Sequence, residues 1–198
     1  MSTKIYLLPD YKPLVGSVKL NFITSPSYLL KIEAAANFQI TLDCCSHQGV
    51  QIIRPNGQAI PYCSRYIDQN NRYLNFLNLP FDKLVNEKCW IFAPRAQVTA
   101  FVQYYLSHPV RPAAMFIILQ HAERPSILEL LTKTAISHRI HTGDRMLRKP
   151  VANRQAFTPY AFPGRLHAIL LPARTRADQL KKRNHKNYFN VNYVPPSE

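Results

Sequence analysis

The sequence is poor in glycine, which limits the loops that can cradle a phosphate. It has 5 glycines in 198 residues. None of them belongs to a G-x-x-x-x-G-K-[ST] or G-x-G-x-x-G pattern, and no G-x-S-x-G nucleophile pattern is present. The common nucleotide-binding loops and the serine-hydrolase elbow are therefore not indicated.

The sequence also lacks a long apolar run. The longest, AAMFIIL at 113–119, is far shorter than the ~20 residues of a membrane helix. The apolar patch at 5–8 ends at Pro9 and is too short for the core of a signal peptide. We expect a soluble intracellular protein without a membrane partner, cytoplasmic, or nuclear if its origin is eukaryotic or viral.

Cysteine is scarce, and its spacing is unlike that of a zinc site. The four cysteines are Cys44, Cys45, Cys63 and Cys89, whereas structural zinc sites usually show two close pairs of ligands. We predict free thiols, mostly buried, with no metal and no cofactor. The alternative is a zinc site made of Cys63, Cys89, His47 and one of the adjacent cysteines, since neighbours on a strand point to opposite faces.

Acidic residues are few, and the excess of cations is unevenly distributed. The chain has 25 Lys+Arg against 11 Asp+Glu, a net charge of +14. Residues 1–132 carry +4 of this charge, and residues 133–198 carry +10. Such an asymmetric charge is typical of proteins that bind a polyanion, which is nucleic acid first and an anionic membrane or an acidic protein second.

The first half of the sequence indicates strands. Apolar and polar residues alternate at 38–43 and, less cleanly, at 18–23 and 30–34, as in half-buried strands. Asn56-Gly57 predicts a hairpin turn within 52–60. We therefore predict an antiparallel meander over 17–80 and a β-rich segment over 17–92.

The second half indicates alternating strands and helices. The short apolar run at 89–92 indicates a strand. Apolar residues from Val98 to Leu106 follow a helical spacing, and 113–119 is predicted to be a buried strand. Ser126 and Glu129 form a capping box, which begins a second helix with Gly143 as its outer limit. A last apolar run at 166–171 completes a βαβ-like half over 93–172.

Together these patterns predict an α+β (mixed α/β) fold. Its elements are an antiparallel β-rich amino-terminal half and two helices packed on a mixed sheet. Residues 1–173 form a single globular domain, and 174–198 form an extended basic carboxy-terminal arm.

Two basic segments are the candidate nucleic-acid contacts. The first is a long predicted loop at 142–164, since long loops in compact domains are usually functional. The second is the arm, which adds aromatic rings on which bases can stack. The candidate phosphate-binding and stacking residues are Arg145, Arg148, Lys149, Arg154, Arg174, Arg176, Lys181, Lys182, Arg183, Lys186, Tyr188 and Phe189. We expect their cations to form one continuous surface.

The histidines offer a weaker, catalytic alternative. His138 and His141 are three residues apart at the end of the second predicted helix, a spacing that places them on one face. His121 and Glu123 could join them as metal ligands. Few other carboxylates are available in this half, which disfavours metal-dependent nuclease chemistry more than a metal-free acid–base mechanism.

The sequence as a whole favours a non-catalytic nucleic-acid-binding protein. It binds RNA or DNA, as a subunit of a ribonucleoprotein or DNA-handling complex with other proteins. One alternative is a nuclease or RNA-processing enzyme that uses His138 and His141. Another is a protein-interaction module that docks on an acidic partner.

Overall fold

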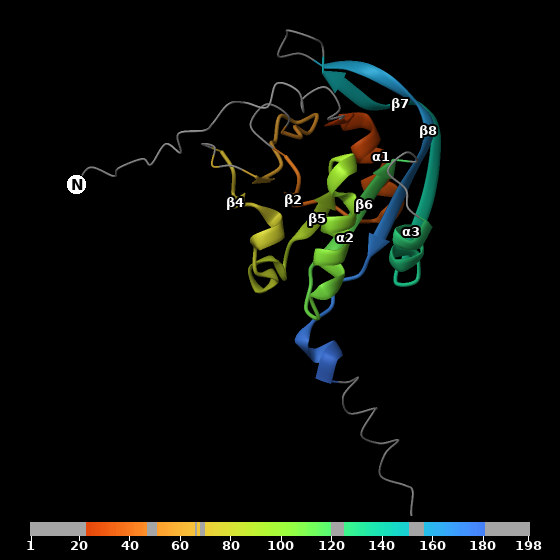
Figure 1. The fold of residues 1–198 in the computed structure, drawn as a ribbon. Helices are drawn as coiled ribbons and strands as arrows, with labels where there is room; N and C mark the ends of the chain where they lie inside the picture. Colours follow the sequence, from red (N-terminus) through yellow and green to blue (C-terminus); the bar gives the residue numbers. More distant parts are fainter. Residues whose placement is uncertain are drawn as a thin grey trace, which may run out of the picture.

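The computed structural model describes residues 23–46, 51–65, 67, 70–119, 125–150 and 157–180. It shows a mixed sheet with helices on both faces (Figure 1), and the predicted α+β class is confirmed. Within these residues no helix has the length and apolar character needed to cross a membrane.

Six strands form the main sheet, in the order β1-β7-β8-β6-β5-β2. They are β1 (Ile23–Thr24), β2 (Leu42–Asp43), β5 (Lys88–Ile91), β6 (Ala113–Leu119), β7 (Ser137–Pro150) and β8 (Phe157–Leu171). A separate parallel pair consists of β3 (Cys63–Ser64) and β4 (Tyr73–Leu74). The helices are α1 (Pro26–Ala36), α2 (Val98–Ser107) and α3 (Pro125–Thr132), with short 3-10 helices η2 (Phe76–Asn78), η3 (Phe81–Leu84) and η4 (Arg95–Gln97).

The sheet is parallel on one side and antiparallel on the other. β2, β5 and β6 pair in parallel, so the predicted βαβ unit β5–α2–β6 is confirmed. β8 pairs antiparallel with β6 and with β7. β7 therefore runs in the same direction as β6, with β8 inserted between them.

The central strand β6 separates two hydrophobic clusters. Ala114, Phe116 and Ile118 belong to the cluster that includes α2 and α3. Met115 and Ile117 belong to the cluster that includes α1. Side chains alternate across a strand, so burial on both faces explains the continuous apolar run in the sequence.

The predicted antiparallel meander over 17–80 is wrong, and a helix occupies part of it. Residues 26–36 form α1, which Ser25 caps by accepting the backbone N–H of Tyr28 at 3.3 Å. Asn37 ends the helix in the left-handed conformation with φ 48°. The buried residues Leu29, Ile32 and Glu33 have helical spacing, which outweighs the short alternation at 30–34.

Three strands of this half, β2, β3 and β4, form parallel pairs, and β1 pairs antiparallel with the distant β7. Leu42 is opposite Cys89 in the β2–β5 pair, and Cys63 is opposite Tyr73 in the β3–β4 pair. Local alternation carries no information about such partners. The hairpin signal at 52–60 is confirmed in a small form, with an antiparallel bridge between Ile53 and Ala59 and Gly57 at φ 82°.

The predicted long loop at 142–164 is also wrong. α3 ends at Thr132, and the chain then forms β7 and β8, which pair with each other along most of their length. Residues 137–142 contain one aliphatic residue, Ile140, so this stretch has no apolar alternation that would predict a strand. In the predicted extended arm, Arg174 forms a bridge with Arg111, and residues 176–180 are helical rather than extended.

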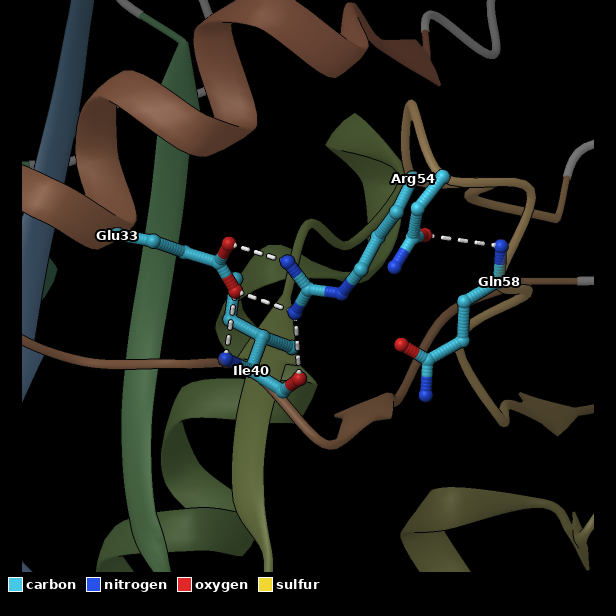
Figure 2. A network of polar contacts seen from close by, with 5 residues as sticks. Glu33, Ile40, Arg54 and Gln58 are labelled. Carbon is cyan, nitrogen blue, oxygen red and sulfur yellow. Dashed lines mark hydrogen bonds and ion pairs between the residues drawn. The ribbon is translucent and has the colours of Figure 1, made fainter.

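A buried ion pair joins α1 to the 52–60 hairpin. Arg54 donates two hydrogen bonds to the Glu33 carboxylate, at 2.5 and 2.6 Å, and a third to the carbonyl oxygen of Ile40 at 2.9 Å. Glu33 also accepts the backbone N–H of Ile40 at 2.7 Å. Figure 2 shows the two charged groups facing each other above the Ile40 backbone. Each charge is satisfied by a partner, as burial requires.

Removing the cation of this pair should destabilise the fold strongly. In Arg54→Met the Glu33 carboxylate stays buried without its partner, so we expect the free energy of unfolding to fall by about 3–5 kcal/mol. The matched control is Lys133→Met, which breaks the exposed Lys133–Glu129 pair and should change stability by less than about 0.5 kcal/mol. Urea unfolding monitored by circular dichroism measures both. If both variants lose equally little free energy of unfolding, Glu33 and Arg54 do not form a buried ion pair.

Candidate nucleic-acid interface

The predicted basic loop is a two-stranded β-ribbon. β8 pairs with β6 only from Leu166 to Leu171. Earlier in β8, residues 157–165 pair with β7 alone. Figure 1 shows these paired strands extending past the end of β6. We call residues 142–150 and 157–165 the β7–β8 ribbon.

Packing on α1 fixes the position of the ribbon. Met146, Leu147 and Phe162 are buried in the hydrophobic cluster that also contains Tyr28 and Leu29 of α1. β1 pairs with β7 beside them, at Ile23–Arg148 and Thr24–Leu147. The register shifts on both sides of Gly143, and such irregularities bend a strand. One face of the ribbon is therefore anchored.

The ribbon and its strands are strongly basic. Residues 137–171 contain six Lys or Arg residues and one Asp, a net charge of +5. The six are Arg139, Arg145, Arg148, Lys149, Arg154 and Arg165. In the ladder Arg148 is opposite Pro159, Lys149 is opposite Thr158, and Arg165 is opposite Thr142. Antiparallel pairing thus concentrates cations from both strands on one narrow element.

The structure separates the predicted contacts into two groups. Arg145, Arg148 and Lys149 lie in β7 near the ribbon end, and Arg148 is half-buried. Arg174 and Arg176 follow the opposite end of β8. The remaining predicted contacts lie outside the described residues: Arg154, Lys181, Lys182, Arg183, Lys186, Tyr188 and Phe189.

The described cations therefore do not form the single continuous surface we expected. β8 has 15 residues, and a strand rises about 3.3 Å per residue, so its ends are up to about 50 Å apart. Figure 1 shows the outer end of the paired strands β7 and β8 and the segment after β8 at opposite ends of the fold. The ribbon alone is the candidate interface in the described part of the chain.

The predicted histidine pair is divided between the two faces of the sheet. His138 and His141 lie in β7, not at the end of a helix, and residues three apart on a strand face opposite ways. The ring of His141 meets Tyr28 of α1 edge-on, with centroids 5.2 Å apart. Burial, followed by the charges of Lys31 and Arg139, lowers the pKa of His141. The two rings cannot act together as acid and base.

His138 instead pairs with a histidine that the sequence did not suggest. Its Nε2 is 3.0 Å from Nδ1 of His167, and the two rings are stacked with centroids 5.2 Å apart. His167 lies in β8 within the apolar run 166–171. The pair is 29 residues apart, so only the β7–β8 register could have revealed it. His121 and Glu123, the other proposed ligands, lie outside the described residues.

Three of the four cysteines meet in the core. Cys44, Cys63 and Cys89 are buried in the cluster beneath α2. Burial, together with hydrogen bonds to the thiols of Cys63 and Cys89, raises the pKa of the Cys44 thiol. All four cysteines are free thiols, as predicted. Within the described residues no group of three or more His, Cys, Asp or Glu side chains could hold a metal ion.

Asp43 is a buried carboxyl group that the sequence did not single out. It ends β2, on the edge where the parallel strands terminate, a common place for ligand sites in such sheets. Burial raises the pKa of Asp43 to about 7, although its Oδ1 accepts the backbone N–H of Cys45 at 3.0 Å. Asp43 is therefore largely protonated below neutral pH.

Comparison of the sequence with models of known protein families and with curated proteins finds no match to either.

The raised pKa of Asp43 makes a prediction about stability and pH. The folded form holds the proton up to about pH 7, and an unfolded Asp releases it near its ordinary pKa of 3.8. The wild-type protein therefore loses stability as the pH rises between these values. Asp43→Asn removes this loss and can keep the hydrogen bond from Cys45.

We expect the stability advantage of Asp43→Asn over wild type to grow by about 3 kcal/mol between about pH 5 and about pH 8. Urea unfolding at the two pH values measures it. The exposed Asp178→Asn, which removes a surface charge beside Thr175, is the control and should show almost no such growth. If the free energy of unfolding of Asp43→Asn changes with pH as that of the wild type does, the raised pKa of Asp43 is disproved.

Proposed function

We propose that this protein binds nucleic acid through the β7–β8 ribbon. The observation that carries the proposal is the concentration of five cations against one carboxylate on two paired strands. Lys and Arg side chains that neutralise phosphates release condensed counterions, and this release drives association. A ribbon held rigid by α1 and β1 presents the cations with little loss of backbone entropy on binding.

The shape of the ribbon favours duplex DNA as the ligand. The major groove of B-form DNA is about 12 Å wide and admits a two-stranded antiparallel ribbon. The major groove of duplex RNA is deep and too narrow for side chains to enter. One face of the ribbon is already packed on α1, so the opposite face would meet the DNA.

The alternatives are weaker on this geometry. His138 and His141 lie on opposite faces of β7, which removes the structural basis for an enzyme that uses them as a pair. Docking on an acidic protein would use the same cations. It differs from DNA binding because it needs a particular partner and not a regular array of phosphates.

Neutralising the described ribbon cations should reduce both affinity and its salt dependence. We expect the double variant Arg148→Gln/Arg165→Gln to bind a duplex DNA oligonucleotide more weakly. The slope of log K against log salt should become less negative by about 1 for each phosphate contact removed. Fluorescence anisotropy between about 50 and about 200 mM salt measures the slope.

The matched control is Arg176→Gln, an exposed cation at the opposite end of β8, which should leave the slope unchanged. Duplex RNA and single-stranded DNA of the same length serve as competing ligands and should bind more weakly. If the wild-type protein binds none of the three at any salt concentration, the proposal is wrong. Equal effects of the ribbon and control variants would place the interface elsewhere.

A further inference from the structure

The His138–His167 pair has the geometry of a metal-chelating site. The two ring nitrogens come from neighbouring antiparallel strands and lie 3.0 Å apart. In the register His138 is opposite Ile169, and His167 is opposite Ile140. Ile169 belongs to the cluster that includes α3, so both imidazoles lie on the α3 side of the sheet.

The separation of the two nitrogens is compatible with binding one metal ion. A distance of 3.0 Å is that of the hydrogen bond between the rings. Two nitrogens bound to one ion at about 2.05 Å lie about 2.9–3.3 Å apart for angles of about 90–109° at the metal. Replacing the hydrogen bond by an ion therefore requires little change in the distance between the two nitrogens.

Solvent reaches one ring of the pair much more than the other. His167 is 5% exposed, whereas His138 is exposed. The β-ladder fixes the backbone of both residues, so little ordering is needed on binding. In the described part of the chain no third metal-type side chain completes a cluster with them. Water or a ligand from solution would fill the open positions.

We propose that His138 and His167 together chelate a divalent transition-metal ion of the nickel or copper class. Imidazole is a common ligand of these two ions, and both bind nitrogen ligands more tightly than most first-row ions do. In the metal-free pair one ring donates a hydrogen bond to the other. On metal binding the donor ring adopts its other tautomer, with the hydrogen on the nitrogen that faces away, so both imidazoles stay neutral and each facing nitrogen donates its lone pair to the metal.

Nickel is the probe of choice, because the chain has free thiols and cupric ion is reduced by thiols. We expect the untagged, full-length protein to bind Ni²⁺ at this site in isothermal titration calorimetry at about pH 7.5. Affinity for Zn²⁺ should be lower, because zinc sites usually take three or four ligands from the protein and this pair supplies two. Since imidazole must be neutral to bind a metal, affinity should fall as the pH is lowered.

Two variants make the test specific. His138→Ala removes the exposed ligand and should weaken Ni²⁺ binding at least about tenfold. His141→Ala is the matched control, since His141 lies on the same strand but faces α1, and its affinity should equal that of wild type. A direct readout is the paramagnetic broadening of amide NMR signals, which should centre on residues 138 and 167.

The remaining outcomes overturn the proposal. It fails if the wild-type protein does not bind Ni²⁺. It also fails if His138→Ala binds Ni²⁺ as tightly as wild type does, or if the NMR broadening centres on another part of the chain. The test does not depend on DNA binding, so the metal site and the proposed function can fail separately.

Discussion

The Glu33–Arg54 ion pair is the contact on which the amino-terminal layer of this structure depends. It joins α1 to the 52–60 hairpin and, through Ile40, to the segment that leads into β2. None of these elements has an extensive strand ladder of its own. The two hydrogen bonds of a bidentate pair fix the relative orientation of its two groups as well as their distance. The pair therefore fixes the orientation of the hairpin relative to α1.

That layer in turn supports the ribbon. α1 presents Tyr28, Leu29 and Ile32 to the sheet, and Met146, Leu147 and Phe162 of the ribbon pack in the same cluster. Ser25, the cap of α1, also donates its backbone N–H to the Met146 carbonyl at 2.9 Å. The basic strands are therefore anchored by packing in a hydrophobic cluster, although their sequence predicted a loop.

The insertion of β8 between β6 and β7 decides which groups meet. It brings His167 beside His138, and it sends the ribbon cations and the Arg174–Arg176 group to opposite ends of one strand. It also turns His141 toward α1 and away from His138. A single topological feature thus accounts for the basic ribbon, for the histidine pair and for the division of the predicted site.

The sequence by itself determined the α+β class, the β5–α2–β6 unit, the buried strand β6, the hairpin turn and the free cysteines. These features depend on local periodicity, capping and turn residues, or on the absence of paired spacing. Only the tertiary structure decided the parallel partners of β2 and β3, the ribbon in place of a loop, and the His138–His167 pair. Each of these depends on contacts between segments that are distant in the sequence. Such contacts are stabilised when both segments bury apolar surface together, and the sequence of either segment alone does not reveal the partner.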